Sequence, residues 1–408
     1  MKRRMLFIAM CLPFNKAFHA GGKTFNYYIQ KFAQDDCEVK LIAKVLPDEE
    51  PYLDSILPEI EVYPVATPKS KAARLLAYGK SLNSKINPWY PYGNTLTKEI
   101  YDQIRRRLTA LKNTGYRPDV VVLEWTAMLL YIDRVKEVFP DAVYVASEHD
   151  VTFLGYERRA ADGRNPLKRL YRTAAYRSMK RHELQSIEKC DLVVTHNEKD
   201  KRLLLQNGVD EGKLGVIAPY YDKFPFINRC SNDRDILFYG AMNRVENYSS
   251  AIWFIESVLP LLRERDVRFI VIGNKPPKEL LERQNDRVVV TGFVDDPAPY
   301  FESAACLVAP LLLGAGVKVK IIEALSSGVP VLTNEIGIEG IDAEDRRDYF
   351  LCRTPEEYAA VIGDILSGKL DTASISANAH ALIEEKYDLE KSYNRYKDRI
   401  MRLVEHGE

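Results

Sequence analysis

The chain has 408 residues, of which 46% are hydrophobic and 28% are charged. This mixture is typical of a folded protein, and it excludes a disordered chain, a collagen-like fibre and a multi-span membrane protein. At about 100–200 residues per domain, the length predicts two or three domains. The 58 basic and 58 acidic residues balance, yet residues 1–230 hold 37 basic and 28 acidic residues, whereas residues 231–408 hold 21 and 30. This asymmetry indicates two units that face different partners.

Short apolar runs alternate with longer amphipathic segments through the first half of the chain. The runs are typical of buried parallel strands, and the amphipathic segments are typical of helices. The expected strands are Leu6–Cys11, Glu38–Ala43, Asp119–Leu123, Ala142–Ala146 and Asp191–Thr195. The expected helices are Gly22–Phe32, Leu96–Leu111, Ala127–Val138 and Pro166–Glu188.

The first residues allow two interpretations. The basic start Met1–Arg4 and the apolar run up to Pro13 resemble a secretory signal, with residues 17–20 as a cleavage site. The run is short, however, and the polar Asn15 and Lys16 follow it. The same residues make a good buried strand before a Gly-Gly loop. We favour the strand, and therefore expect a cytoplasmic protein whose scattered cysteines are reduced.

The alternation restarts after an aperiodic segment rich in proline and aromatic residues, 219–232. The expected strands are Asp235–Tyr239, Arg268–Ile272, Arg287–Thr291, Cys306–Val308 and Val329–Thr333. The expected helices are Tyr248–Arg265, Pro277–Arg283, Val317–Ser327, Thr354–Gly363 and Tyr387–Val404. The pattern predicts an α/β protein of two doubly wound, Rossmann-like domains that face a central cleft, at residues 1–225 and 226–385. We expect the C-terminal helix in 386–408 to cross back onto the first domain.

The most informative stretch is a glycine-rich turn that leads from a strand into a helix. Its residues are Gly314, Ala315, Gly316 and Val317. Backbone N–H groups of such a turn and the positive end of the following helix attract an anion, and Lys318 and Lys320 add full positive charges. Glu323 follows one turn later, where it can accept hydrogen bonds from the hydroxyls of a ribose. A diphosphate and a ribose together describe a nucleotide.

With Phe238–Met242, Trp253–Phe254 and Val290–Val294, this block resembles the retaining glycosyltransferases of family 4, also called glycosyl transferases group 1, which have the GT-B fold. The resemblance extends over nearly the whole chain. It implies transfer of a sugar from a nucleotide-diphosphate sugar, without a metal or another cofactor. We expect the donor to be a UDP-sugar.

The resemblance also implies roles for individual residues. Lys318 and Lys320 would hold the leaving diphosphate and stabilise its charge, and Glu323 would hold the ribose. The backbone around the strand end at residues 292–294 would meet the base. The remaining residues expected on the donor side are Gly240, Asn247, Gly292, Phe293, Val294, Gly314, Ala315, Gly316 and Val317.

Two positions depart from the family pattern. Ala315 stands where many members carry the first glutamate of a Glu-x7-Glu motif, so sugar recognition by that glutamate does not carry over. Ala241 and Asn247 stand where many members carry an arginine and a lysine, so the charge of the diphosphate would fall mainly on the two lysines. A variant enzyme is favoured, and a non-catalytic carbohydrate-binding partner protein of this fold stays an alternative.

A second glycine loop follows the first predicted strand at residues 19–22. In the family such a loop approaches the donor phosphates, which assigns Gly21 and Gly22 to the donor and His19 to the acceptor side. Ala17–Thr24 also satisfies a relaxed P-loop pattern with alanine for the first glycine. A P-loop ATPase or kinase is therefore an alternative, although no aspartate for Mg²⁺ follows the strand 119–123.

His149 follows the strand 142–146, and in the family a histidine or aspartate there faces the acceptor and the donor sugar. We expect His149 to be a catalytic contact, because imidazole titrates near neutral pH. Asp150 would orient it, and Trp125 would lie on the acceptor side. Taken alone, the pair is equally typical of a helix cap beside a surface histidine. No histidines stand at metal-ligand spacing, so no metal is expected.

Basic residues gather in the first half at Lys69–Lys80, Arg105–Arg107 and Arg158–Arg181, with aromatic residues among them. They favour an anionic membrane surface or a lipid-linked acceptor, although solvated helix faces explain them equally well. No nucleic-acid motif accompanies them. The predicted function is sugar transfer to a glycan or lipid-linked acceptor in cell-surface polysaccharide or glycoconjugate biosynthesis. The expected location is the cytoplasm, with peripheral contact at the inner face of the membrane left open.

Overall fold

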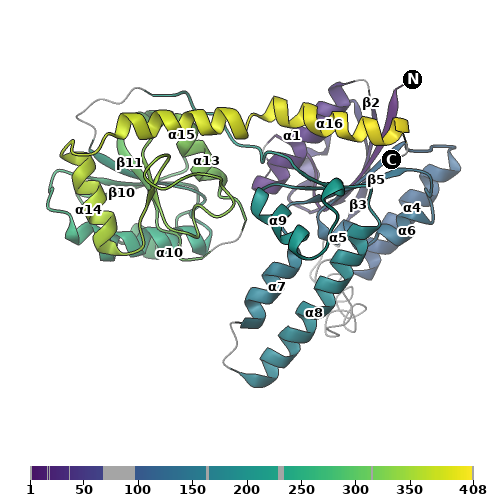
Figure 1. The fold of residues 1–408 in the computed structure, drawn as a ribbon, viewed down its shortest axis with the longest axis horizontal. Coiled ribbons are helices and arrows are strands. Elements are labelled where there is room, and N and C mark those ends of the chain that lie inside the picture. Colours follow the sequence, from purple (N-terminus) through teal and green to yellow (C-terminus); the bar gives the residue numbers. More distant parts are fainter. Residues whose placement is uncertain are drawn as a thin grey trace. The chain divides into compact units, whose positions relative to one another are not determined.

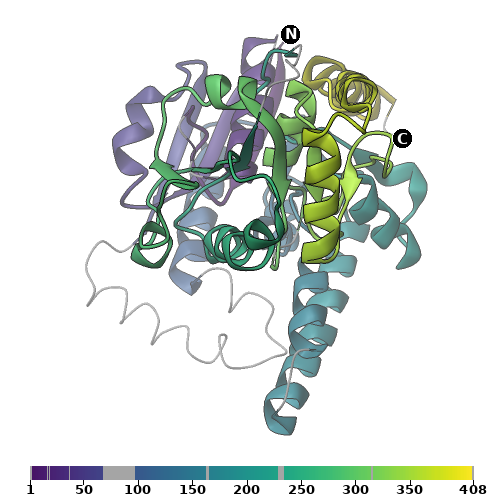
Figure 2. The same cartoon turned by 90° about the vertical axis from the view of Figure 1, so that its left-hand side faces the viewer.

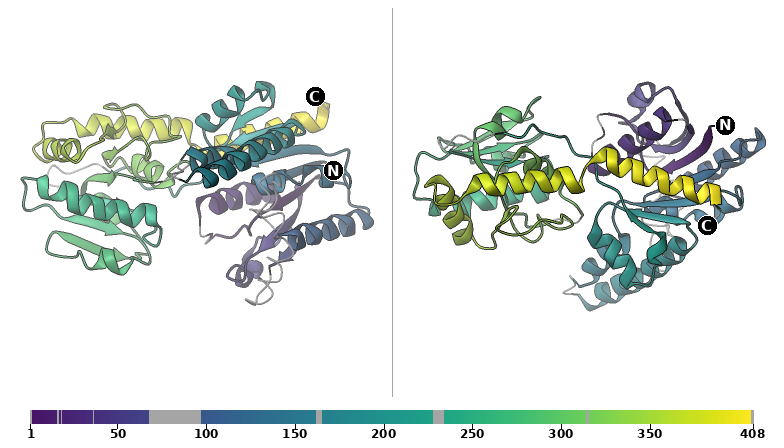
Figure 3. Two further views of the ribbon diagram at one scale, coloured as in Figure 1. Left: turned by 90° about the horizontal axis from the view of Figure 1, so that it is seen from below. Right: turned by 45° about the horizontal axis from the view of Figure 1, so that its top comes forward.

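The computed structural model describes residues 2–15, 17, 19–35, 37–67, 97–161, 165–227, 234–313 and 316–406 (Figure 1). The chain divides into two compact units. Unit 1 comprises Met1–Tyr220 and Leu389–Glu408, and unit 2 comprises Tyr221–Asp388. Both are parallel sheets covered by helices, as Figure 3 shows for each unit. The prediction of two doubly wound α/β domains is therefore confirmed.

Unit 1 is built on a sheet of seven described strands in the order β3-β2-β1-β4-β5-β6-β7, and all neighbouring strands are parallel. The strands are β1 (Arg3–Ala9), β2 (Cys37–Val45), β3 (Ile60–Ala66), β4 (Val120–Glu124), β5 (Val143–Glu148), β6 (Leu192–Thr195) and β7 (Leu214–Val216). The start of the chain is thus a central strand, which confirms that these residues form the buried strand expected of them.

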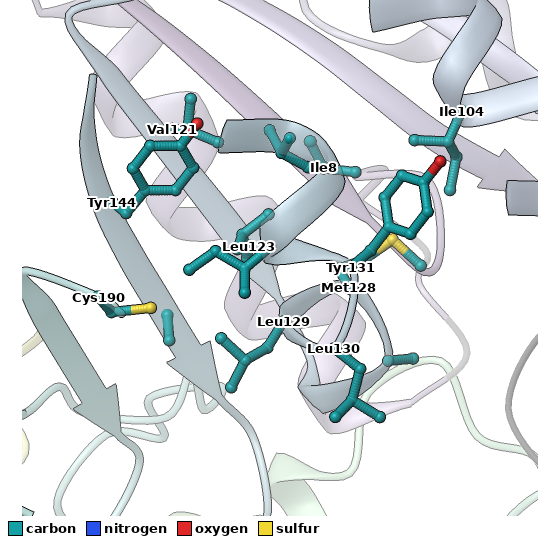
Figure 4. Close-up of a cluster of buried hydrophobic side chains, with 14 of the residues drawn as sticks. Ile8, Ile104, Val121, Leu123, Met128, Leu129, Leu130, Tyr131, Tyr144 and Cys190 are labelled. Carbon is teal, nitrogen blue, oxygen red and sulfur yellow. The ribbon is translucent and has the colours of Figure 1, made fainter. Parts of the chain in front are cut away.

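Alternate residues of each central strand enter two different cores. In β1, for example, Leu6 and Ile8 belong to one cluster, and Met5 and Phe7 belong to the other. Figure 4 shows part of the first cluster, where Val121 and Leu123 of β4 lie with Ile104 of α4 and with Met128 and Leu129 of α5. A strand that is buried on both faces reads as a continuous apolar run, which is why the runs were recognisable in the sequence.

Helices cover both faces of this sheet. They are α1 (Ala20–Gln34), η1 (Glu50–Ser55), α4 (Lys98–Asn113), α5 (Thr126–Leu129), α6 (Ile132–Lys136), α7 (Thr152–Ala161), α8 (Pro166–Glu188), α9 (Glu198–Gln206), η3 (Glu211–Lys213) and α16 (Leu389–His406). The C-terminal α16 packs beside α1 in unit 1: Ser392 lies 2.7 Å from the hydroxyl of Tyr28, and Lys397 donates to Asp35 at 2.8 Å. The short helix α7 and the long helix α8 form a pair that extends away from the sheet (Figure 2).

Unit 2 is built on a sheet of six described strands in the order β10-β9-β8-β11-β12-β13, again all parallel. The strands are β8 (Asp235–Tyr239), β9 (Phe269–Ile272), β10 (Val288–Gly292), β11 (Ala304–Ala309), β12 (Val331–Thr333) and β13 (Phe350–Leu351). The helices are α10 (Val245–Trp253), η4 (Phe254–Val258), η5 (Leu259–Leu261), α11 (Lys278–Leu281), α12 (Ala298–Glu302), α13 (Val319–Ser327), α14 (Pro355–Leu366) and α15 (Thr372–Lys386).

Two expected helices are not continuous in the structure. The segment 127–138 is divided into α5 and α6, because Met128–Ile132 are all buried and one straight helix cannot turn five consecutive residues into a core. The segment 248–265 begins as α10, widens into η4 and tightens into η5, ending before Leu262. Pro260, which has no N–H to donate, lies in that last turn.

Several elements were not predicted at all. They are the outer strands β3, β7 and β13 and the helices η1, α7, α9, η3, α12 and α15. Short edge strands carry little periodicity, and α15 has no strong apolar stripe among its residues. No helix in the described part of the chain combines the length and apolar character that a bilayer crossing requires.

Candidate functional site

The strand orders place a switch point in each unit. In unit 1, the strands after β1 are added on one side of it, towards β3, and the strands from β4 onward are added on the other side, towards β7. In unit 2 the order reverses in the same way between β8 and β11. Ligands of open parallel sheets bind beyond the carboxyl ends of the strands at such points, where adjacent loops diverge. A ligand is therefore expected at the loops after these four strands, and most of the site residues predicted from the sequence lie in or beside these loops.

In unit 2, the loop after β8 is held against the first turn of α13. Lys320 of α13 donates to Oδ1 of Asn247 at 2.7 Å, and the amide nitrogen of Asn247 donates to the carbonyl of Ala241 at 2.8 Å. A Cβ on Gly240 would lie 3.4 Å from Nζ of Lys320. The structure thus brings together three residues, Gly240, Asn247 and Lys320, that the sequence assigned to the donor.

The glycine that ends β9 completes this loop. A Cβ on Gly273 would lie 1.6 Å from the carbonyl oxygen of Gly240, and Gly273 has a φ of 156°. No side chain fits between the two backbones, so the β8 and β9 loops touch through glycine alone. Sequence reasoning missed Gly273, although a glycine directly after an apolar run is the signal that identifies such close approaches.

Lys320 is held in surroundings that oppose its charge. Its Nζ lies 4.7 Å from the centre of the Phe238 ring. Burial, together with the neighbouring charge of Lys318, lowers the pKa of Lys320 from 10.5 to about 7. A bound anion would reverse this effect, because an opposite charge favours the protonated lysine. A buried lysine with so perturbed a pKa, beside a glycine loop, is a candidate for a functional site.

Lys318 and Glu323 lie on the same stretch of chain. Lys318 is the residue before α13, its ammonium group contacts the carbonyl of Gly316, and Nζ lies 3.8 Å from Oε2 of Glu339. Glu323 is 5% exposed, and its Oε1 accepts a hydrogen bond from the backbone N–H of Asp222 at 3.2 Å. Both residues that were expected to bind the donor therefore lie at the start of α13 or within it. Val317 is partly buried beside them.

The other donor-side predictions fall at two places. Gly292 ends β10 with a φ of 73°, and the side chain of Phe293 that follows is 70% exposed, with Val294 partly buried after it. An aromatic ring that exposed at a strand end is available to a planar ligand. Gly314 and Ala315 lie outside the described residues.

In unit 1, the loop after β1 enters α1 through His19. Nδ1 of His19 accepts a hydrogen bond from the backbone N–H of Gly22 at 2.9 Å and so caps the helix. A Cβ on Gly21 would lie 3.1 Å from Nδ1 of His149 and 3.4 Å from the ring of Trp125. The predicted residues His19, Gly21, Trp125 and His149 are therefore neighbours in the folded unit.

Three aromatic rings from three adjacent strand ends form a stack. Trp125, directly after β4, lies 4.0 Å from His149, directly after β5, with only 12° between the ring planes. His149 lies 4.4 Å from His196, directly after β6, at 28°. Trp125 takes a φ of 67°, a conformation that non-glycine residues seldom adopt and that is often found at functional sites.

A buried carboxyl group fixes the histidine in this stack. Oε2 of Glu124 lies 2.9 Å from Nε2 of His149, and the two side chains are 5% and 6% exposed. Burial raises the pKa of Glu124 to about 8 and lowers the pKa of His149 to about 3. Burial therefore favours the neutral form of both groups, in which the Glu124 carboxyl would donate to Nε2, and Nδ1 of His149 lies on the side of Gly21.

Behind this stack lies a pair of buried glutamates. Thr126 donates to Glu148 at 2.6 Å, and Glu183 of α8 accepts from the backbone N–H groups of Thr152 and Phe153, both at 2.8 Å. Burial raises the pKa of Glu183 to about 8 and that of Glu148 well above its usual value. Glu183 thus joins α8 to the first N–H groups of α7 at the base of the α7–α8 pair.

Three of these residues, Glu124, His196 and Glu183, had no predicted role. Glu124 and His196 each end an apolar run, in the same way as His149, and the parallel order β4-β5-β6 brings such ends together. That shared position is the signal that would have found them. Asp150, expected to orient His149, is exposed, and the hydrogen bond at His149 comes from Glu124.

The P-loop alternative gains no support from these contacts. β1 ends at Ala9, so Ala17 does not follow its strand directly, as the first residue of a P-loop does. The hydroxyl of Thr24, which would bind Mg²⁺, is buried, donates to the carbonyl of Ala20 and accepts from the N–H of Tyr220. Among the residues that the structure describes, no group of three His, Cys, Asp or Glu side chains is arranged to hold a metal ion.

A family described as Glycosyl transferases group 1 matches residues 233–368. The matched segment contains Gly240, Asn247, Lys318, Lys320 and Glu323. Among curated proteins, the chain is 23% identical over 193 residues to an uncharacterized 44.6 kDa protein in the cps region of Klebsiella pneumoniae, a match over 44% of this chain and 48% of that protein. The chain thus matches about half the length of this curated relative.

Solved structures resemble the chain over nearly its full length. Anabaena Alr3699/HepE in complex with UDP has a TM-score of 0.67 and 14% identity, with 99% of this chain and 100% of that chain covered. Sucrose-phosphate synthase from Thermosynechococcus elongatus has a TM-score of 0.70 and 14% identity, with coverage of 98% and 99%. S. aureus TarM in complex with Fondaparinux, alpha-GlcNAc-glycerol and UDP has a TM-score of 0.65 and 13% identity, with coverage of 98% and 100%. At these identities the likeness shows the fold, which is that of the GT-B glycosyltransferases.

Proposed function

We propose that the protein is a glycosyltransferase that takes a sugar from a nucleotide-diphosphate donor, with unit 2 as the donor-binding part and unit 1 as the acceptor-binding part. The observation that carries this proposal is the arrangement of Gly240, Asn247 and Lys320 at the switch point of unit 2. It supplies a cation and a helix N-terminus for a diphosphate, within the segment that matches the group 1 family.

The chemistry follows from what these groups stabilise. As the bond between sugar and diphosphate breaks, negative charge develops on the leaving oxygen, and fixed positive groups that meet that charge lower the barrier. Lys320 and Lys318, with the N–H groups at the start of α13, take this role. No metal is required, and Glu323 holds the ribose. Retention of configuration, as in the family that the sequence resembles, belongs to the same proposal.

The donor and the acceptor are proposed by class. A UDP-sugar is the preferred donor, a choice supported by the UDP found with Anabaena HepE and with TarM, whose fold this chain shares. The acceptor is a glycan or a lipid-linked glycan, and the process is cell-surface polysaccharide or glycoconjugate biosynthesis at the cytoplasmic side of the membrane. The similarity to a protein in a cps region supports this setting.

Thermal unfolding with UDP, GDP, ADP and ATP, each with and without Mg²⁺, tests the nucleotide class. The expected result is a rise of the unfolding temperature with UDP that does not depend on Mg²⁺. A bound ligand at 100 times its dissociation constant stabilises by about 2.7 kcal/mol, which is well within detection. Stabilisation by none of the four would contradict the proposal, and stabilisation only by ATP with Mg²⁺ would favour a P-loop enzyme instead.

A further inference from the structure

The outer end of the α7–α8 pair carries an exposed apolar face. Leu167 is 77% exposed, Leu170 is 70% exposed, and Tyr171 is 42% exposed. Their spacing of three and four residues places them on one side of α8, at the end of the pair that points away from the sheet of unit 1 (Figures 1 and 2). Apolar side chains gathered and exposed to this degree mark an interaction surface.

The same end is strongly basic. Residues 157–161 and 165–172 hold five basic residues and one acidic residue. Arg158 and Arg159 at the end of α7 are exposed, as are Lys168 and Arg169 in the first turns of α8. Two such surfaces would repel each other, which disfavours a second copy of the chain as the partner. An anionic surface that also accepts apolar side chains is complementary to both features.

The fold does not depend on these exposed side chains. The inner half of the pair is anchored in the core of unit 1 through Phe153, Met179 and Ile187. Asn165 caps the start of α8 by accepting from the N–H groups of Leu167 and Lys168. The stability of the fold therefore does not explain why two leucines are exposed here. Substitutions of their side chains are expected to leave the helix pair intact.

We propose that this outer end, residues 157–161 and 165–172, is a docking surface for an anionic lipid bilayer. Leu167 and Leu170 enter the boundary between headgroups and acyl chains, where Tyr171 is also favoured, and the arginines and lysines meet anionic headgroups. The proposal goes beyond sugar transfer, because it assigns a membrane contact to a surface remote from both switch-point loops of unit 1. It also gives a lipid-linked acceptor a reason to be near the protein.

Co-sedimentation with vesicles tests the proposal on the full chain. We expect binding to phosphatidylcholine vesicles that contain a quarter of phosphatidylglycerol, weakened by salt, and little binding to pure phosphatidylcholine. Replacing both charges in Lys168→Gln/Arg169→Gln is expected to weaken binding about thirtyfold, at about fivefold per charge. Leu167→Ser/Leu170→Ser is expected to weaken it at least about tenfold through lost apolar burial.

Two matched controls separate this surface from a general effect of charge or of apolar side chains. Arg263→Gln/Arg265→Gln removes two exposed charges from unit 2, and Leu281→Ser removes an exposed leucine from the same unit. Both are expected to bind vesicles as the unaltered protein does. All variants should keep the thermal shift with UDP, so that failure of lipid binding is distinguishable from failure of the proposed transferase.

Three outcomes overturn the proposal. The first is that the unaltered protein does not bind the anionic vesicles, and the second is that the leucine or lysine–arginine variants bind them equally well. The third is that the protein is a dimer in solution, the leucine variant is a monomer and vesicle binding is unaffected, which would assign the surface to a second copy of the chain.

Discussion

The two switch points of this protein differ in the kind of side chain that they bring together. In unit 2, Lys320 on the first turn of α13 donates to Asn247 close to Gly240, and we propose that it binds an anion. In unit 1, a neutral glutamic acid, two neutral histidines and a tryptophan form a stack in which burial suppresses charge. Strand ends in the same kind of fold therefore hold an ionisable lysine in one unit and a cluster of uncharged buried groups in the other.

The difference is visible in the direction of the pKa shifts. Burial lowers the pKa of Lys320 to about 7, so this lysine gives up its proton readily and regains it with an anionic ligand. Burial raises the pKa of Glu124 to about 8 and lowers that of His149 to about 3, so these groups stay uncharged without any ligand. Unit 2 is thus expected to respond to ligand and pH together, and unit 1 to act through geometry.

The largest effect is expected from Lys320→Met. The substitution keeps the length and apolar stem of the side chain but removes the charge that would meet the leaving diphosphate. Removal of one such group typically lowers kcat by about 10²–10³, and the thermal shift with UDP should disappear. Lys278→Met, which removes an exposed lysine from the same unit, is the control and should change neither. Retention of full activity in the Lys320 variant would show that the anion binds elsewhere.

The next effect is on the pH dependence of UDP binding. Because the lysine must be protonated to bind an anion, the dissociation constant should rise above about pH 7, with a limiting slope of about tenfold per pH unit. Lys320→Arg should remove this dependence, since a guanidinium stays charged throughout. Calorimetric titrations between pH 6 and 9 measure both. A curve for the unaltered protein that is flat over this range would contradict the role of Lys320.

Most of the fold could be predicted because both sheets are buried on two faces. Continuous apolar runs such as Val120–Leu123 identify central strands without ambiguity, and the helices between them follow from periodicity. Edge elements such as β13, which has two residues, leave no comparable pattern. The division between α5 and α6 could not be foreseen either, because only the packed core shows that Met128–Ile132 are buried on every side.

The candidate sites were predictable to different extents. In unit 2 the glycines and Lys320 are close in sequence to a helix start, so local pattern and family resemblance were enough to find them. In unit 1 the stack joins residues from three separate strand ends, and only the strand order places Glu124 and His196 beside His149. The charge state of such a group depends on its burial, which sequence does not state.

A smaller effect is expected from Gly21→Ala in unit 1. The added Cβ would lie 3.1 Å from Nδ1 of His149, closer than ordinary contact, so the histidine must shift by a few tenths of an ångström. A displacement of about 1 Å typically costs about 10²-fold in rate, so this smaller shift should lower kcat/KM by several-fold. Gly155→Ala, where a Cβ meets nothing within 4 Å, is the control. An unchanged kcat/KM would contradict a role of Gly21 in the site, and an added loss of UDP binding would agree with its expected place on the donor side.

The smallest effect is a difference in pH-dependent stability. Glu124 stays protonated in the folded chain up to about pH 8 but ionises at about 4.5 when unfolded, so unfolding between these values releases a proton and stability falls as pH rises. Lys320 has the opposite sign: unfolding binds a proton between about pH 7 and 10.5, and stability rises with pH there. Unit 1 and unit 2 are therefore expected to shift in opposite directions between about pH 7 and pH 8.

Glu124→Gln removes the pH-dependent stability that Glu124 contributes, because the amide keeps the hydrogen bond to Nε2 of His149 and has no proton to release. The variant should unfold at a higher temperature than the unaltered protein, and this difference should grow from pH 5 to pH 8. Each kcal/mol of added stability corresponds to about 2–4 °C. Glu188→Gln, at an exposed position of α8, should show no such growth. If the gain for Glu124→Gln were the same at both pH values, Glu124 would be ionised in the folded chain. The stack would then hold a charged pair, and the contrast between the two units would be lost.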